Sequence, residues 1–199
     1  MTHYFDKEPV SDHEIKTIHW QIDGRSFTFV TDQSVFSRYR VDFGTQRLIM
    51  SFITGTDPKN GRVLDLGCGY GVVGIVLKRL YPALTVVMTD INARAVGLAR
   101  LNAEQNSVRY ADVIQSDGLT DVNGTFDVVL TNPPVRAGKE TVYRFFSESA
   151  ERLNPGGVLY VVLQKKQGAA SAQKKLEALF PDVRIVDRTA GYHVIRAQR

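Results

Sequence analysis

The feature that most limits how this chain can fold is a regular alternation of short apolar runs with longer helical stretches. Strands that are apolar throughout and alternate with helices are typical of a parallel sheet covered on both faces. The last run can return as a hairpin, so the sequence predicts an α/β fold with a seven-stranded, mostly parallel sheet and one antiparallel terminal strand. The runs lie at 62–66, 84–89, 111–116, 126–131, 158–163, 183–187 and 193–197, and the helical stretches lie near 71–81, 92–105, 139–153 and 169–180.

Two further elements precede this series. Residues 17–31 alternate between apolar and polar side chains on either side of Asp23-Gly24, a dipeptide that favours a tight hairpin turn. A helical pattern then runs from about Thr45 to Ile53. We expect residues 1–34 to form an N-terminal β-ribbon extension and residues 35–199 to form one globular domain.

The composition is that of a chain with one core and no covalent or metal support. With 199 residues, 43% of them hydrophobic, the chain is long enough to bury a sizeable core. Cys68 is the single cysteine, so an internal disulfide is excluded, and no Cys/His cluster has the spacing of zinc ligands. The first twenty residues contain no apolar stretch long enough for a signal peptide or a membrane span. We therefore expect a soluble cytoplasmic protein with no metal and no membrane partner.

Basic side chains are concentrated in particular stretches. The net charge is +4, and the segment from Gln164 to the end carries eight bases against three acids. Such a local excess suits a phosphate-bearing partner, although any one group taken alone is as typical of a solvated face. Two further basic groups are Arg38, Arg40 and Arg47, and Arg136, Lys139 and Arg144.

Ligands of parallel α/β folds bind beyond the carboxyl ends of the strands, so the loops there are the candidate site. After the first strand of the series, residues 65–74 read DLGCGYGVVG. Glycines permit a tight strand-to-helix turn and let a ligand approach backbone N–H groups. Gly69, Gly71 and Gly74 also have the G-x-G-x-x-G spacing of dinucleotide loops. Cys68 lies within this loop without a convincing base, so it is interpreted as a small residue in a tight turn.

Two acidic residues follow the next two strands. Asp90 lies about 20 residues beyond the glycine loop, where nucleoside-binding proteins place an acceptor for the ribose hydroxyls. This spacing supports a nucleoside and leaves NAD and S-adenosylmethionine open. Asp117 follows the third strand and is either an acceptor for an adenine amino group or a turn cap.

The fourth loop, Asn132-Pro133-Pro134, has the chemistry to bind an amino group. Proline has no N–H and pushes the preceding residue into an extended conformation, so the loop is stiff and lacks main-chain donors. The acceptors that remain are the Asn132 side-chain oxygen and the carbonyls of Asn132 and Pro133. Two such acceptors can orient a planar amine as its nitrogen attacks a methyl group in line. Proton loss can follow the transfer, so no strong base is required.

At this point the sequence resembles a known family. The motifs VLDLGCGYG, Asp90, Ser116-Asp117 and TNPP resemble the class I S-adenosylmethionine-dependent methyltransferases that methylate amino groups of bases or amides. The stretches VFSRYRVDFGTQRL (35–48), TNPPVRAGK (131–139) and VLQKKQGAASA (162–172) resemble the RsmC-type ribosomal RNA guanine-N2 methyltransferases. The resemblance implies a Rossmann-like fold, in which residues 35–199 form a class I methyltransferase domain. It also implies S-adenosyl-L-methionine as the cofactor and ribosomal RNA or the small ribosomal subunit as the partner.

The resemblance also assigns roles to individual residues. Asn132, Pro133 and Pro134 would form the catalytic loop, with Asn132 facing both the methyl group and the target nitrogen. In related enzymes the region matching Gly44-Thr45-Gln46 closes over the cofactor, so Phe36, Asp42 and Thr45 are secondary candidates. Phe36 and Tyr39 are the candidates for stacking on the base. The implied cofactor-binding residues are Asp65 near the amino end, Gly67, Gly69 and Gly71 at the methionyl part, Asp90 at the ribose, Asp117 at the adenine, Thr45 and Asn132. The expected substrate-binding residues are Phe36, Arg38, Arg136, Lys139 and Lys165.

Two departures from the family pattern and several alternatives bear on the substrate. Val135 stands where adenine and glutamine methyltransferases commonly have an aromatic residue, and the chain has room for one domain where some RsmC-type proteins have two. The leading hypothesis is methylation of guanine N2 in 16S ribosomal RNA. The alternatives are methylation of a protein glutamine amide or another amine, a non-catalytic RNA-binding module, and an NAD-binding oxidoreductase.

Overall fold

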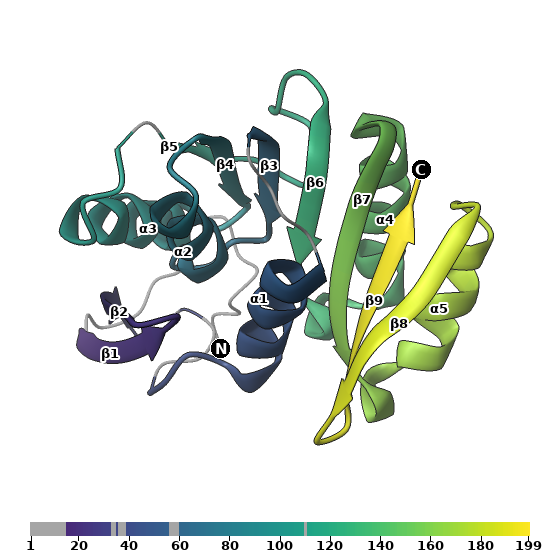
Figure 1. Cartoon of the computed structure of the whole chain (residues 1–199), viewed down its shortest axis with the longest axis horizontal. Coiled ribbons are helices and arrows are strands. Elements are labelled where there is room, and N and C mark those ends of the chain that lie inside the picture. Colours follow the sequence, from purple (N-terminus) through teal and green to yellow (C-terminus); the bar gives the residue numbers. More distant parts are fainter. Residues whose placement is uncertain (1–14, 33–34, 36–38, 56–59, 110) are drawn as a thin grey trace.

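The computed structural model describes residues 15–32, 35, 39–55, 60–109 and 111–199. Within this part of the chain, a seven-stranded sheet is flanked by helices, and a separate two-stranded hairpin lies next to the helices on one face of the sheet (Figure 1). The helices are α1 (Phe43–Gly55), α2 (Val72–Leu80), α3 (Ala93–Gln105), α4 (Lys139–Arg152) and α5 (Ala169–Glu177), with short 3-10 turns η1 (Val135–Ala137) and η2 (Lys165–Gln167). The sheet strands are β3 (Gly61–Leu66), β4 (Leu84–Asp90), β5 (Ala111–Gln115), β6 (Phe126–Thr131), β7 (Leu153–Gln164), β8 (Asp182–Thr189) and β9 (Tyr192–Gln198).

The order of the strands is β5-β4-β3-β6-β7-β9-β8. The strands β5, β4, β3, β6 and β7 pair in parallel, and β9 is antiparallel to both of its neighbours. The predicted mostly parallel sheet with one antiparallel terminal strand is therefore confirmed. The last strand of the chain returns through the tight turn at Ala190-Gly191, where φ is positive at both residues, and inserts between β7 and β8. Chain order reverses between β3 and β6, which is where such folds bind ligands.

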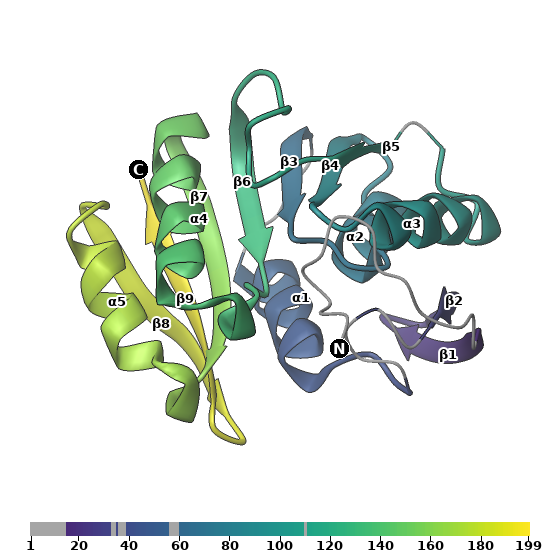
Figure 2. The same cartoon turned by 180° about the vertical axis from the view of Figure 1, so that it is seen from behind.

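Both faces of the sheet are covered because successive strand residues point to opposite sides. In β6, Val128 and Leu130 join the core under α1, α2 and α3, whereas Val129 joins the core under α4 and α5. Figures 1 and 2 show the two helical layers on opposite sides of the sheet. The prediction of helices on both faces is confirmed. Because each face of the sheet packs into its own hydrophobic core, the strands are apolar along their whole length.

The predicted N-terminal hairpin consists of β1 (Lys16–Ile22) and β2 (Arg25–Thr31), paired in antiparallel register around Asp23-Gly24. Two asparagines, one in α3 and one that caps its end, hydrogen-bond to the edge of β2 as a neighbouring strand would. The Asn102 amide accepts from the Val30 N–H at 2.6 Å and donates to the Val30 carbonyl at 2.9 Å, and Asn106 makes the same pair of bonds with Thr28. Asn102 also donates to the Tyr70 carbonyl at 2.9 Å, so the hairpin is tied to the glycine loop.

Two elements begin earlier than the sequence pattern predicts. Helix α1 begins at Phe43 because Asp42 caps it: its carboxylate accepts the Thr45 N–H at 3.0 Å. Strand β7 begins at Leu153 because that residue pairs with Phe126, before a register shift lets the two strands pair again at Val128 and Val158. Among the described residues, none of the helices is long and apolar enough to cross a membrane.

Candidate active site

The loops after β3, β4 and β6 meet at the carboxyl edge of the sheet and are bonded to one another. The backbone N–H groups of Gly67 and Cys68 both donate to the Thr89 carbonyl, at 2.9 and 2.8 Å. On the other side, the Thr131 hydroxyl donates to the Leu66 carbonyl at 2.8 Å. The glycine loop is therefore held between the end of β4 and the Asn132-Pro133-Pro134 loop.

The backbone of the glycine loop requires glycine at several positions. Gly67, Gly69 and Gly71 have φ of 74°, 56° and 92°, in the left-handed region that side chains rarely adopt. Gly74 serves another purpose, since a Cβ there would lie 2.4 Å from the Met88 Cγ, so α2 can pack this closely on β4 only with glycine. The predicted tight turn from strand to helix is thus formed.

Asp65 is buried at the start of this loop, with 2% of its surface exposed. One carboxylate oxygen accepts the Gly74 N–H at 2.9 Å and so fixes the first turn of α2. Desolvation by burial raises the pKa of Asp65 to about 7, opposed by the Gly74 hydrogen bond and supported by repulsion from Asp90. The side chain is therefore a protonated carboxyl over part of the physiological pH range.

Cys68 does not have the environment of a nucleophile. Burial, together with the charges of Asp65 and Asp90, raises the pKa of the thiol well above its usual range. The sulfur lies 3.5 Å from the Gly69 carbonyl oxygen. These contacts fit the interpretation of Cys68 as a small residue in a tight turn.

Asp90 ends β4 directly beside the glycine loop. Its two carboxylate oxygens accept the backbone N–H groups of Gly69 and Asn92, each at 2.9 Å. The Asn92 side chain in turn caps α3 by accepting from the N–H groups of Arg94 and Ala95. Asp90 is thus held by both loops, and a carboxylate at this edge is a suitable acceptor for the two hydroxyls of a ribose.

Asp117 lies in the loop after β5, half exposed, and pairs with Arg144 of α4. Glu148, one turn further along α4, accepts the Leu119 N–H at 3.0 Å and so fixes the same loop. Burial raises the pKa of Glu148, against the opposing effects of the Leu119 hydrogen bond and of Arg144. Helix α4 therefore determines where the Asp117 loop lies.

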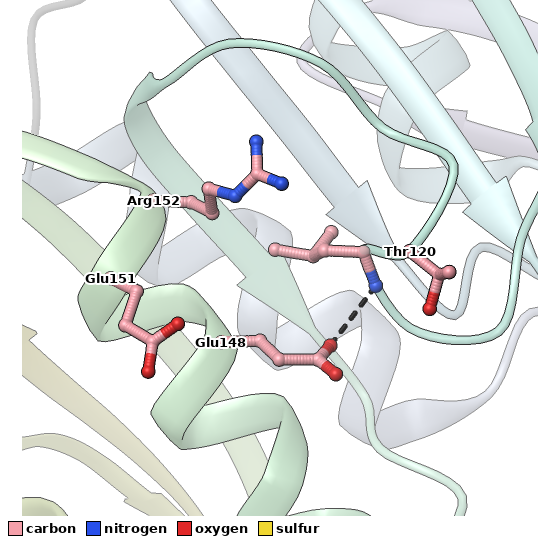
Figure 3. Close-up of a pocket in the computed structure, with 5 residues that line it drawn as sticks. Thr120, Glu148, Glu151 and Arg152 are labelled. Atoms are coloured by element: carbon pink, nitrogen blue, oxygen red, sulfur yellow. Dashed lines mark hydrogen bonds between the residues drawn. The ribbon is translucent and has the colours of Figure 1, made fainter.

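A small pocket of about 190 Å³ opens between this loop and α4 (Figure 3). Glu148 reaches across it to the loop, and Arg152 points toward the same loop from the next turn of the helix. None of its lining residues is a predicted site residue; they are Leu119, Thr120, Glu148, Glu151 and Arg152.

The Asn132 side chain is held at the end of β6 by α1. Its amide nitrogen donates to the Asp42 carboxylate at 3.1 Å and to the Thr45 hydroxyl at 3.0 Å. No described residue donates to its side-chain oxygen. The Pro133 carbonyl accepts the Val135 N–H at 2.8 Å, which turns the chain into η1. The Asn132 side-chain oxygen is thus an acceptor that no described residue occupies, whereas the Pro133 carbonyl, another predicted acceptor, is already bonded to Val135. That this loop binds an amino group stays a prediction.

Several of the predicted basic residues lie at this same edge. Arg136 is exposed on η1, Lys139 is exposed at the start of α4, and Lys165 is exposed on η2 after β7. The Lys139 ammonium lies 5.1 Å from the centre of the Tyr143 ring. Phe36 and Arg38 lie outside the described residues. Tyr39 is exposed, with the Lys16 ammonium 4.6 Å from its ring centre.

The sequence patterns missed an aromatic pair beside this loop. Phe43 begins α1 and is 36% exposed, and its ring centre lies 5.6 Å from that of Tyr192 on β9. The Tyr192 hydroxyl accepts a hydrogen bond from Gln164 at the end of β7. No local pattern marks Tyr192, because its position depends on the insertion of β9 beside β7.

Comparisons with known proteins identify the family of this chain. The model of the methyltransferase small domain family matches residues 26–196. The chain belongs to this family. The predicted class I methyltransferase fold is thereby confirmed. The predicted cofactor, S-adenosyl-L-methionine, is the methyl donor of this family.

Relatives of the methyltransferase small domain family indicate a subgroup. The chain is 43% identical to an uncharacterized protein, YbxB, of Bacillus subtilis (strain 168), over 99% of this chain and 98% of that one. It is 33% identical to ribosomal RNA small subunit methyltransferase C of Enterobacter sp. (strain 638), over 97% of this chain and 52% of that enzyme. The resemblance to the RsmC type is thereby confirmed.

A solved structure gives the same result. A T. thermophilus 16S rRNA N2 methyltransferase (RsmC), in complex with AdoMet and guanosine, superposes with a TM-score of 0.85 and 26% identity, covering 96% of this chain and 52% of that one. The chain thus spans about half the length of the RsmC enzymes that it matches. Among the described residues, no group of His, Cys, Asp and Glu side chains could hold a metal ion.

The buried carboxyl of Asp65 makes the stability of this protein depend on pH. Between about pH 4 and pH 7 the carboxyl is ionised in the unfolded chain and protonated in the folded one, so its stabilising contribution is lost as pH rises through this window. We expect Asp65→Asn, which retains an oxygen acceptor for Gly74, to gain stability relative to the wild type across the window, by as much as about 4 kcal/mol above pH 7.

The measurement is urea unfolding at a series of pH values, with Asp112→Asn on the exposed side of β5 as a control for removing a strand carboxylate. The free energies of unfolding of Asp65→Asn and the wild type should diverge as the pH rises from 4 to 7. A difference between them that stays constant over this range would contradict the raised pKa of the buried Asp65 carboxyl.

Proposed function

We propose that this protein transfers a methyl group from S-adenosyl-L-methionine to an exocyclic amino group, guanine N2 of small-subunit (16S) ribosomal RNA. The observation that carries the proposal is the hydrogen bonding of the Asn132 side-chain amide. Both of its N–H groups are engaged by Asp42 and Thr45, so its oxygen is presented as an acceptor beside the glycine loop. An acceptor to which no residue in the described part of the chain donates is complementary to an amino group.

Beyond acceptors for the target amine, methyl transfer requires no strong base from the protein. The lone pair of the target nitrogen is delocalised into its ring, and acceptors on both N–H groups favour the pyramidal, partly cationic form that attacks the methyl carbon. With the cofactor bound, a new N–C bond would form as the C–S bond broke with its electron pair left on sulfur, and the nitrogen would then lose a proton to solvent. The cofactor supplies an electrophilic methyl group. Asn132 is neutral, so no second charge need be buried beside the amine.

The described residues fit the cofactor by their chemistry. Positive φ at Gly67, Gly69 and Gly71 makes a tight loop without side chains, and the methionyl part of the cofactor could approach the backbone of this loop closely. Asp90 is the proposed ribose acceptor and Asp117 the proposed acceptor for the adenine amine. The proposal retains Asp65 near the amino end of the cofactor and Asn132 beside its methyl group, with Thr45 behind Asn132 through their hydrogen bond.

Guanine in RNA is favoured by three features taken together. The superposing T. thermophilus enzyme was solved with AdoMet and guanosine, and this chain aligns with it over 96% of its length. The basic residues Arg136, Lys139 and Lys165 lie where an RNA backbone would approach the loop. Phe43 offers an exposed ring on which an unstacked base can lie, a role that Val135 cannot fill. A ribosomal substrate also places the enzyme in the cytoplasm.

Replacing the acceptor tests the catalytic role directly. We expect Asn132→Ala to lower the turnover of methyl transfer to unmethylated small ribosomal subunits by a factor on the order of 100. The dissociation constant for S-adenosyl-L-methionine, measured by calorimetry, should change little. Asn123→Ala, in the exposed loop before β6, is the matched control and should retain full turnover. Equal turnover in Asn132→Ala and the control would remove the catalytic role of this residue.

Salt dependence tests whether the substrate carries phosphates. We expect the double change of Lys139 and Lys165 to Gln to weaken RNA binding and to reduce the slope of log affinity against log salt by about 0.7 for each single-stranded phosphate that is no longer neutralised. The control is Arg152→Gln, at the opposite end of α4 and roughly 20 Å from Lys139 by helix rise. An unchanged slope in the lysine variant would instead indicate a substrate without phosphates at this edge.

A further inference from the structure

The Asn132 amide is held by two acceptors from a segment that lies far away in the sequence. Its nitrogen donates to Asp42, 90 residues away, and to Thr45, 87 residues away. A side-chain amide has two N–H donors, so both are used. Rotating the amide by half a turn would place its oxygen against the Asp42 carboxylate, which repels it. The amide therefore has one favoured orientation.

The two acceptors are themselves fixed by the first turn of α1. The Asp42 oxygen that receives the Asn132 donor also accepts the Thr45 N–H at 3.0 Å, and the Asp42 backbone carbonyl accepts the Gln46 N–H at 3.0 Å. Gly44 lets this turn pack closely, since a Cβ there would lie 2.7 Å from the Tyr192 ring and 2.9 Å from the Asp42 carboxylate.

The rest of α1 is anchored to the sheet. Leu48, Ile49 and Phe52 are fully buried in the core that α1 shares with β7. On the other side of the helix, the Arg47 guanidinium pairs with Asp187 of β8 at 2.7 Å. The acceptors for Asn132 thus lie on a rigid element, which is what the precise positioning of a reacting group requires.

We propose that Asp42 and Thr45 are positioning residues for methyl transfer, which hold the Asn132 amide so that its oxygen faces the target amino group. The inference rests on the proposed function and adds two residues to it. Donation to a carboxylate also polarises the amide and makes its oxygen a stronger acceptor. Neither residue needs to touch the target amine, because each acts through Asn132.

The experiment removes one acceptor and keeps the helix. Thr45→Val deletes the hydroxyl, Thr45→Ser restores it, and Thr54→Val makes the same change at the exposed end of α1. We expect Thr45→Val to lower kcat on small ribosomal subunits about tenfold, with the dissociation constant of S-adenosyl-L-methionine unchanged. Thr45→Ser and Thr54→Val should both retain most of the wild-type kcat.

A double-mutant cycle tests whether Thr45 acts through Asn132. In an Asn132→Ala background, Thr45→Val should change the remaining single-turnover rate by less than about twofold, because there is no amide left to hold. A further tenfold loss in that background would overturn the proposal. So would a Thr45→Val variant whose only defect is weaker cofactor binding.

Side-chain amide NMR gives a readout that does not depend on activity. The two Asn132 amide protons, assigned with Asn132→Ala, should shift and exchange faster with water in Thr45→Val and not in Thr54→Val. Asp42→Asn, which retains an acceptor for the cap of α1, should also move these signals. Unchanged signals in both variants would overturn the proposal, whereas a wild-type protein that methylates no ribosomal RNA would overturn only the proposed function.

Discussion

The parallel pairing of β3 with β4 on one side and β6 on the other is the arrangement on which the candidate site depends. Because all three strands end at the same edge, the glycine loop after Leu66 lies between the Asp90 loop and the Asn132-Pro133-Pro134 loop. Hydrogen bonds to the carbonyls of Thr89 and Leu66 then join the three loops. Residues far apart in the sequence, each ordinary when taken alone, become one site through this pairing.

Within that arrangement, the loops have different roles in the proposed function. The glycine loop and Asp90 have backbone and carboxylate chemistry that suits a nucleoside cofactor, and they are held rigidly by each other through the Gly69 N–H. In the Asn132 loop, the side-chain oxygen of Asn132 is the acceptor proposed to bind the target amino group. Helix α1 completes the site from the opposite face of that loop, since Asp42 and Thr45 determine which way the amide points. The function proposed here therefore depends on α1 as much as on the two motifs.

The parts of the fold that repeat locally could be predicted from sequence. Apolar runs and helical periodicity identified the sheet, the helices and the final hairpin, and Asp23-Gly24 identified the first hairpin. The Asn102 amide that replaces a strand beside Val30 could not be predicted, nor could the contact of Asp42 with Asn132, because each joins segments more than 70 residues apart. Phe43 and Tyr192 were missed for the same reason, since they meet only once α1 packs beside β9.

The central claim is that Asn132 presents its oxygen to the amino group of a guanine. The most direct test treats small ribosomal subunits that lack methyl groups with this protein and an isotope-labelled methyl donor, then digests the RNA to nucleosides for mass spectrometry. We expect label in N2-methylguanosine with the wild-type protein and a large loss of that label with Asn132→Ala. Label in another nucleoside, or in ribosomal protein rather than RNA, would contradict it.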